Sequence, residues 1–328
     1  MKKSFVFILM GVGVLMFSAC SAVDEEVEMD HEVVDDMQEP PPLGDEPTAV
    51  NPGGFHPSDM YSYIFTSEDG LTWEKRNEAV HGSVPHMIQS DNGDLIATFQ
   101  YFAGDDKRGV MAYASSSDLG VTWSEPVVLD IVDLPGTVDQ KTSQKPSNPL
   151  PVDPTLAQLE DGRFRIYFTY HEIGFDRPGP HSAVADSMDG EFEYEGPLFR
   201  DEDYYILDPA VVYFDGLWHY YTASIGQNAE REKDDNYVAY HAVSEDGVEF
   251  ELEEMLDLDF SMLGGAVVVG DGLRFYGSDP AGRSAGYSAD GYEWEALTEA
   301  ELRCSDPGVV YLEDSDSYLM ICQVHGEK

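Results

Sequence analysis

Short apolar runs, separated by turn residues, recur along most of the chain. The runs Leu95–Phe102 and Phe164–Tyr170 are rich in aromatic and β-branched residues, and Asn-Gly or Asp-Gly precedes each of them. These dipeptides between apolar runs are a strong signal for a β-hairpin. No long stretch shows the 3.6-residue period of an amphipathic helix. The pattern therefore predicts an all-β protein built from hairpins.

The hairpin is repeated, with an apolar strand, a turn and a returning strand in each copy. The copies begin at Val84, Asp153, Asp208, Gly264 and Asp306. A second repeat, Ser-x-Asp-Gly with one inserted residue in its second copy, follows the first four hairpins and also precedes them all. Its copies begin at Ser67, Ser116, Ser187, Ser244 and Ser288, at spacings of 49, 71, 57 and 44 residues. These spacings are typical of a supersecondary unit with loops of variable length.

The chemistry of the second repeat explains its form. The Asp side chain can bond nearby backbone N–H groups, and Gly tolerates a positive φ, so the pair favours a tight turn. An aromatic residue follows in four copies, as Trp73 does in the first, and can pack beneath the turn; the copy at Ser187 is degraded. The repeat resembles the Asp-box of the sialidase-like β-propellers, which forms the turn between the third and fourth strands of a blade.

Together the two repeats predict a five-bladed β-propeller over residues 56–328. Each hairpin and the Asp-box pair behind it supply the four antiparallel strands of one blade. The hairpin at Asp306 has no Asp-box behind it, and the Asp-box at Ser67 has no hairpin before it. We therefore expect the two ends of the chain to combine into one blade, which closes the ring and leaves no free sheet edge at the seam.

The N-terminal segment has the pattern of an exported protein. Two Lys, a short apolar run and small residues before Cys20 predict a signal peptide over residues 1–19. The ending Phe17-Ser18-Ala19-Cys20 resembles a bacterial lipobox, which implies a lipidated Cys20 and an envelope lipoprotein of the outer membrane or cell surface. The alternative is an ordinary signal peptide with an incidental Cys. Residues 20–55 are expected to be a disordered tether, since residues 24–46 hold 11 acidic side chains and no Lys or Arg.

The charge balance restricts the partners. With 64 acidic and 18 basic residues the formal net charge is −46. Nucleic acid and anionic membrane surfaces would be repelled, so contact with a membrane is expected through the lipid anchor only. Solubility accounts for most of this acidity. A Ca²⁺ ion on the propeller axis is the alternative use of some carboxylates, and no cofactor is required.

Strand order places the starts of the five innermost strands around the central mouth, on the face opposite the Asp-boxes. Asp153, Asp208 and Asp306 converge there, with His86 nearby. Each Asp-Pro is also a common strand entrance. Crowded like charges cost free energy unless they share a proton, shift a pKa or hold a cation. Loops on the same face carry further candidates for binding, namely Arg108, His171, Arg177 and His181, together with Glu172.

The Asp-Pro hairpins also resemble those of the five-bladed furanosidase clan of arabinanases, levansucrases and invertases. The resemblance implies a glycoside hydrolase in which Asp153 is base or nucleophile and Asp208 tunes a pKa or holds a cation. The clan's acid motif is not recognisable here; Glu172 is the candidate acid because it follows the second strand of its blade and can reach the mouth, and the alternative is an exposed loop carboxylate. The Arg of the Phe-Arg-Ile-Pro motif of sialidases is replaced by Ser83, so sialic acid is not the expected ligand. The alternative is a non-catalytic propeller that binds a glycan, a small molecule or a partner at its mouth.

Two cysteines lie on the two strands of the last hairpin. Cys304 and Cys322 could form a cross-strand disulfide in an exported protein, although the expected register sets them a step or two out of alignment. A pair of buried thiols is the alternative.

Overall fold

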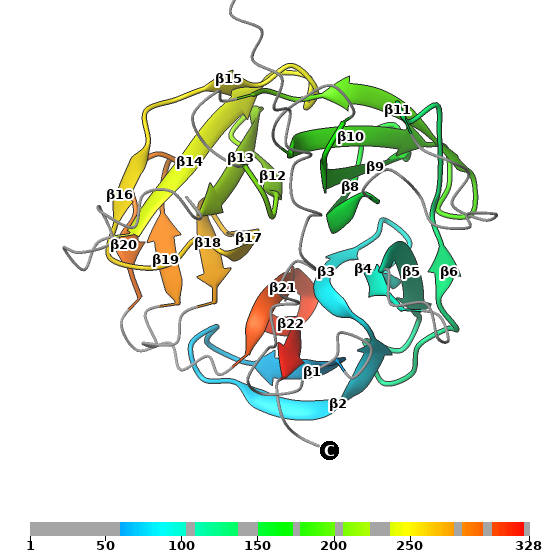
Figure 1. Ribbon diagram of the computed structural model, residues 1–328. Coiled ribbons are helices and arrows are strands. Elements are labelled where there is room, and N and C mark those ends of the chain that lie inside the picture. Colours follow the sequence, from blue (N-terminus) through cyan, green and yellow to red (C-terminus); the bar gives the residue numbers. More distant parts are fainter. Residues whose placement is uncertain are drawn as a thin grey trace, which may run out of the picture. The chain divides into compact units, whose positions relative to one another are not determined.

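The computed structural model describes residues 60–102, 109–136, 150–172, 178–200, 206–223, 237–278, 284–297 and 304–324. They form five antiparallel sheets arranged around a central axis (Figure 1), which confirms the predicted five-bladed β-propeller. The described helical structure is one short 3₁₀ turn, η3 (Glu313–Ser315). None of the described residues forms a helix with the length and apolar character needed to span a membrane.

The five blades have the following strands, in order from the axis outward. The closing blade holds β21 (Ser305–Leu312), β22 (Ser317–Val324), β1 (Tyr61–Ser67) and β2 (Glu74–His81). Blade 2 holds β3 (Ser83–Gln89), β4 (Leu95–Tyr101), β5 (Val110–Ser116) and β6 (Val127–Val128). Blade 3 holds β8 (Val152–Gln158), β9 (Phe164–Tyr170), β10 (Gly179–Ala185), β11 (Glu191–Pro197) and β7 (Asp130–Val132).

Blade 4 holds β12 (Ala210–Phe214), β13 (Leu217–Ala223), β14 (Tyr237–Ser244), β15 (Glu251–Leu252) and β16 (Leu256–Leu258). Blade 5 holds β17 (Gly264–Val269), β18 (Gly272–Gly277), β19 (Ala285–Ser288) and β20 (Glu295–Ala296). Two details differ from a plain four-stranded repeat. Strand β7 adds a parallel edge to β11, and β15 and β16 divide the length of β14 between them.

The closing blade joins the two ends of the sequence as predicted. Strand β1 pairs with β22 over its whole length, from Tyr61 opposite Val324 to Ser67 opposite Tyr318. The N-terminal strands supply the outer half of this blade and the C-terminal strands the inner half. Strand β1 therefore pairs with β2 on one edge and with β22 on the other. The seam therefore has no free strand edge.

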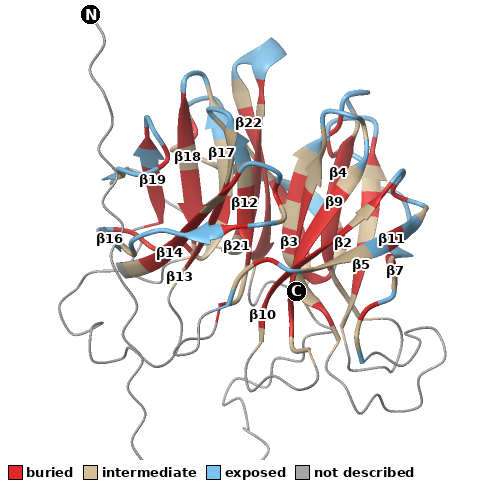
Figure 2. Cartoon of the chain, turned by 90° about the horizontal axis from the view of Figure 1, so that it is seen from above, coloured by how far each residue is buried: buried red, intermediate tan, exposed pale blue. Residues whose placement is uncertain are grey.

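The hydrophobic core lies between the blades. Each of five buried clusters combines residues of two neighbouring blades; Phe99 of blade 2, for example, shares a cluster with Ile321 of the closing blade. Buried positions run through the middle of the strands, and exposed positions gather at the hairpin tips (Figure 2). Each blade thus buries its apolar side chains mainly against the neighbouring blades.

The Ser-x-Asp-Gly turns join the third and fourth strands of the blades. In the first copy the Ser67 hydroxyl accepts the Gly70 N–H at 2.8 Å, and Asp69 Oδ1 accepts the N–H groups of Leu71 and Thr72, both at 2.8 Å. Gly70 has a φ of +71°, which few other residues adopt at low cost. Neighbouring blades also meet at these turns, because Arg274 of blade 5 donates to the Asp69 carbonyl at 2.6 Å.

The same contact recurs elsewhere in the ring. Arg165 of blade 3 donates to the Asp246 carbonyl at 2.7 Å, and Tyr221 of blade 4 donates to the Gly291 carbonyl at 2.7 Å. In the degraded copy the Gly190 N–H bonds the Ser187 carbonyl at 3.1 Å in place of its hydroxyl. The repeated turns therefore shape the hairpins and connect adjacent blades.

Candidate functional site

The starts of the innermost strands adopt an unusual backbone conformation in four blades. Val84, Asp153, Asp208 and Asp306 have φ values of 47°, 56°, 49° and 51°, in the left-handed region that residues other than Gly seldom occupy. Each of them immediately precedes a Pro. The pairing register is irregular at this position in β3, β8 and β21, as in a β-bulge. A bulge redirects a side chain. In these three strands the irregularity lies at the equivalent position, near the start of the strand.

Polar side chains of the preceding blade support these strained residues. Thr169 of blade 3 accepts the Asp208 N–H at 3.1 Å, and Ser278 beside blade 5 accepts the Asp306 N–H at 2.7 Å. The Gln100 amide of blade 2 donates to Asp153 Oδ1 at 3.2 Å. All three supporting residues lie at or just beyond the end of the second strand of their blade. Hydrogen bonds between blades thus stabilise the strained backbone conformation at the mouth.

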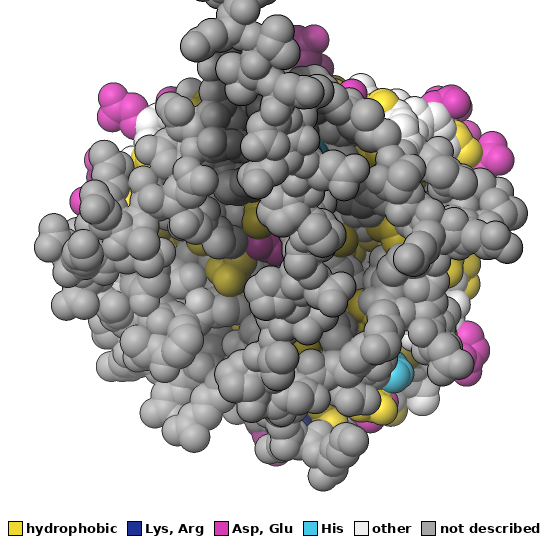
Figure 3. Space-filling model, viewed as in Figure 1, with side chains coloured by type: hydrophobic (Ala, Val, Ile, Leu, Met, Phe, Trp, Pro, Cys, Tyr) yellow, Lys and Arg dark blue, Asp and Glu magenta, His cyan; other side chains and the backbone are white. Residues whose placement is uncertain are grey.

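Asp153, Asp208, Asp306 and His86 line one small pocket at the mouth, together with the prolines that follow the three aspartates. The prediction that these four residues converge is therefore correct. Acidic side chains are visible near the centre of this face, beside apolar ones (Figure 3). The pocket has a volume of about 20 Å³, room for roughly one water molecule.

Burial and mutual repulsion shift the pKa values of the three carboxyls. Burial, followed by the charges of Asp153 and Asp306, raises the pKa of Asp208 to about 8. Burial and the charge of Asp153 raise the pKa of Asp306 to about 6. Burial also raises the pKa of Asp153, and hydrogen bonds with Thr169 and Asp208 oppose that rise. At neutral pH the neighbouring carboxyls of Asp153 and Asp208 therefore retain a proton between them.

His86, which also lines this pocket, is a neutral imidazole. Burial lowers the pKa of His86 to about 4. Its Nδ1 accepts the Leu156 N–H at 3.3 Å, so Nε2 carries the proton. The Nε2–H group of His86 can therefore donate one hydrogen bond.

Glu172 lies apart from the residues that line the acidic pocket. Its carboxylate forms an ion pair with Arg200, with 2.5 Å between Oε2 and Nη2, and both side chains are partly exposed. His171 immediately precedes it and is also partly exposed. Arg108 and Arg177 lie outside the described residues.

His181 occupies the interior of blade 3. It is fully buried, its Nδ1 is 2.8 Å from the Tyr194 hydroxyl, and it stacks on Phe168. Burial lowers the pKa of His181 to about 3. The binding role that we predicted for His181 at the mouth is therefore replaced by packing, because the position that reads as loop belongs to strand β10 and faces inward.

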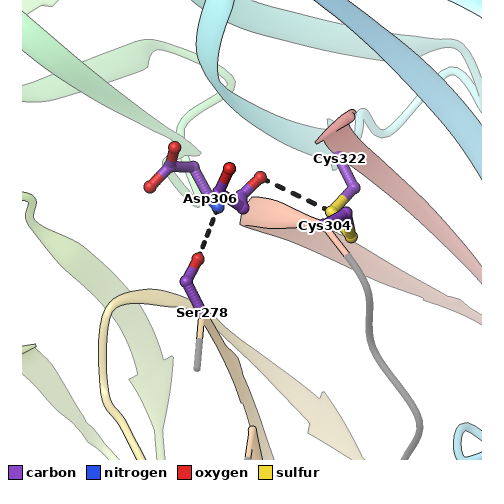
Figure 4. Close-up of a disulfide and its surroundings, with 5 residues drawn as sticks. Ser278, Cys304, Asp306 and Cys322 are labelled. Carbon is purple, nitrogen blue, oxygen red and sulfur yellow. Dashed lines mark hydrogen bonds between the residues drawn. A yellow bond between two sulfur atoms is a disulfide. The ribbon is translucent and has the colours of Figure 1, made fainter. Parts of the chain in front are cut away.

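The two cysteines form a disulfide close to the acidic pocket. Cys304 and Cys322 are bridged with a Cα–Cα distance of 5.8 Å. The expected offset in register is real, since Ser305, the residue after Cys304, pairs with Gln323. The Asp306 side chain points away from the bridge, and its backbone N–H bonds Ser278 (Figure 4). The disulfide thus fixes the start of β21 two residues before Asp306.

Metal ligands are not clustered in the part of the chain that the structure describes. Among these residues no group of three or more His, Cys, Asp or Glu side chains is arranged to hold a metal ion. The three aspartates of the acidic pocket do not form such a group.

Several residues of the site could not be identified from the sequence. Thr169, Ser278 and Gln100 act on a carboxyl or N–H that lies 28 to 53 residues away. Tyr220 is fully buried, and its pKa is raised well above its usual value by burial and by the nearby charges of Asp208 and Asp153. The alternation of aromatic residues in β13 indicated only that Tyr220 would be in a core.

Comparisons with known proteins identify the fold. No family model and no curated protein matches the sequence. Zg3597, a family 117 glycoside hydrolase from the marine bacterium Zobellia galactanivorans, has a TM-score of 0.50 at 14% identity, over 81% of this chain and 91% of its own. CoXyl43, a GH43 β-xylosidase/α-arabinofuranosidase from a compost metagenome, was solved with xylotriose in a calcium-free form. Its TM-score is 0.51 at 16% identity, over 81% of this chain and 91% of its own.

A protein of unknown function from Dyadobacter fermentans is similar to the same degree, with a TM-score of 0.50 at 13% identity, over 80% of this chain and 83% of its own. At such identities the likeness establishes a shared fold. The chemistry of the present protein must therefore be argued from its own residues.

Proposed function

We propose that this protein is a carbohydrate-active propeller and that its acidic mouth hydrolyses a glycosidic bond. The observation that carries the proposal is the convergence of Asp153, Asp208 and Asp306, from three blades, on one pocket in which their pKa values are raised. Paired carboxyls in different protonation states are what acid–base hydrolysis of a glycoside requires. The fold shared with glycoside hydrolases is consistent with this use.

The roles follow from the environments of the carboxyls. Asp153 is the base or nucleophile, because burial raises its pKa while hydrogen bonds with Thr169 and Asp208 support its charged form. Asp208 holds a proton at neutral pH and tunes its neighbour, since its pKa is about 8. Glu172 is the proton donor to the leaving group. It is ion-paired with Arg200 in the structure, so it must leave Arg200 and take up a proton from solvent before it donates that proton to the glycosidic oxygen.

A panel of chromogenic glycosides tests the proposal. Wild type is expected to cleave at least one member, and Asp153→Asn to lose about 10²–10⁴-fold in kcat/KM. Asp161→Asn is the matched control, because Asp161 lies in the turn of the same hairpin, at its other end, and pairs with Arg163 in solvent. Equal activity of the two variants would contradict the proposal. Arms with added Ca²⁺ and with a chelator test the alternative of a cation on the axis.

A binding function without catalysis is favoured by one observation. The pocket of about 20 Å³ between the carboxyls is smaller than a sugar ring, so a glycan would rest on the mouth and contact the carboxyls only at its edge. A glycan array distinguishes the two functions. Binding to the array by wild type and by Asp153→Asn, with no turnover on the panel, would favour the binding propeller.

We also propose that the protein is exported and anchored in the envelope. The signal peptide 1–19, lipidated Cys20 and tether 20–55 support this proposal from the sequence and lie outside the described residues. Incorporation of labelled palmitate by wild type, but not by Cys20→Ser, tests the anchor. The geometry of the Ser-x-Asp-Gly turns further supports a place among the Asp-box propellers.

A further inference from the structure

The propeller axis has a second cavity, at the end opposite the acidic mouth. It has a volume of about 800 Å³ and is lined by the later residues of all five innermost strands. This size lies within the range of pockets that hold small molecules. We refer to it as the apolar channel, after the partly or fully exposed aliphatic side chains in its wall: Ile88, Ala157, Val212, Ala266, Val267 and Val268.

The rim of the apolar channel exposes large apolar side chains to solvent. Leu119, Tyr213 and Val268 line the channel and are 47%, 45% and 37% exposed. Large apolar side chains that are exposed together around a cavity are typical of an interaction site. The hairpin tips that surround this end are the exposed tips in Figure 2.

The rim also has one sign of charge. Asp91, Glu313 and Asp314 are exposed carboxylates that line the channel, and no Lys or Arg is among its described lining residues. Tyr213 and Trp218 lie beside each other at the rim, with ring centroids 5.3 Å apart. Aromatic faces and carboxylates together favour an organic cation, above all an ammonium group.

We propose that the apolar channel is a binding site for an organic ammonium cation that carries an apolar chain. The chain enters among the aliphatic residues of the inner strands, and the ammonium group remains at the rim against Tyr213, Trp218 and the carboxylates. An anionic amphiphile would meet Asp91, Glu313 and Asp314 at the same rim. The charge of the rim thus selects between ligands of equal apolar content.

Titration calorimetry on the full chain, with decyltrimethylammonium below its micellar concentration, tests the proposal. Saturable binding is expected, with Trp218 fluorescence changing in parallel. Decyl sulfate and tetramethylammonium are each expected to bind at least tenfold more weakly, since the first has the wrong charge and the second no chain. Equal binding of decyl sulfate, of tetramethylammonium or of the neutral decyl maltoside would overturn the proposal.

Variants locate the site. Ala266→Phe fills the channel and should reduce the affinity for decyltrimethylammonium at least tenfold. Tyr213→Ser changes an exposed side chain, so it tests the rim even if Ala266→Phe fails to fold, and a loss of at least threefold is expected. Leu252→Ser is the matched control, because Leu252 is 43% exposed on β15, away from the channel lining, and should leave the affinity unchanged. A Tyr213→Ser protein that binds as wild type does would overturn the proposal.

Discussion

The two ends of the propeller axis are built by the same five strands and differ in almost every physical property. At the mouth four of the five strand starts have a residue of positive φ, and three of these residues are aspartates with raised pKa values around a pocket of about 20 Å³. At the other end they continue as ordinary extended strands around the 800 Å³ apolar channel. Close contact explains part of the narrowing, because a Cβ on Gly308 would lie 2.8 Å from the His86 Cα.

This contrast teaches where the fold tolerates strain. Positive φ outside glycine and crowded carboxyls both cost free energy, and the two occur together at the mouth. At the other end the residues of positive φ, namely Leu119, Asp215 and Asp316, lie in turns. The opposite face has turns whose N–H groups are accepted by Ser and Asp side chains. Strained residues next to crowded carboxyls, supported by hydrogen bonds from neighbouring blades, are typical of a functional site. Four experiments test the contrast, in order of decreasing expected effect.

Removal of the disulfide should have the largest effect, because it releases the start of β21 at the strained end. The double variant Cys304→Ser, Cys322→Ser is expected to lose about 3 kcal/mol of unfolding free energy, since the bridge closes a loop of 18 residues. Chemical denaturation measures the loss. Wild type with a reductant should match the variant, and a variant as stable as oxidised wild type would show that the mouth does not depend on the bridge.

Asp208→Asn should stabilise the protein in alkaline solution. The pKa of Asp208 is about 8 in the folded state, above its unfolded value, so folding retains a proton and stability falls as pH rises from about 4 to about 8. The variant lacks this loss, and we expect a gain of about 2 kcal/mol at pH 8, discounted for partial exposure, and little change near pH 4. Denaturation curves across this range measure it. Asp161→Asn, at the other end of the axis, should show no such gain.

Asp246→Ala tests the Ser-x-Asp-Gly turns on the face opposite the mouth. Asp246 Oδ1 accepts the Val248 and Glu249 N–H groups at 2.8 and 2.9 Å. Loss of these bonds should cost about 1 kcal/mol, as the loss of a capping side chain does. The matched control is Asp189→Ala in the degraded copy, where the Ser187 hydroxyl is the described partner, and its cost should stay within about 0.5 kcal/mol. Equal costs would mean that the side chain of the turn is not what stabilises this end.

Val84→Asn should have the smallest effect and the opposite sign. A β-branched residue at a φ of 47° is strained, whereas Asn tolerates this region, so a gain of about 0.5–1 kcal/mol is expected. Val212→Asn makes the same exchange in the apolar channel, where the strand has no positive φ, and should be destabilising. Thermal melts of the two variants measure the difference. A destabilised Val84→Asn protein would show that its side chain matters more than its backbone.

The architecture could be predicted from the sequence because its signals are local. Asn-Gly, Asp-Gly and Ser-x-Asp-Gly determine turns within a few residues, and their order along the chain predicts the blades and their closure. The convergence of Asp153, Asp208 and Asp306 followed from that topology. The disulfide remained open in the sequence, because the bulge between Ser305 and Gly308 that sets its register leaves no signal there.

The conformation of the mouth could not be predicted in this way. A residue before Pro is expected to be extended, and at Val84, Asp153, Asp208 and Asp306 the tertiary structure overrides that preference. Partners far away in the sequence, such as Thr169 for Asp208 and Arg200 for Glu172, depend on the packing of distant segments. Their residue types are common on any strand or loop, so the sequence contains no sign of their role.

The closing blade also determines when the protein can finish folding. Tyr61 and Val324 are direct partners across the seam, so β1 and β2 are synthesised early and have no inner half to pair with until β21 and β22 have been made. A chain still attached to the ribosome therefore holds an open arc with β1 unpaired on one side. Contacts this distant in sequence form slowly, and the ring can close only after β21 and β22 have been made.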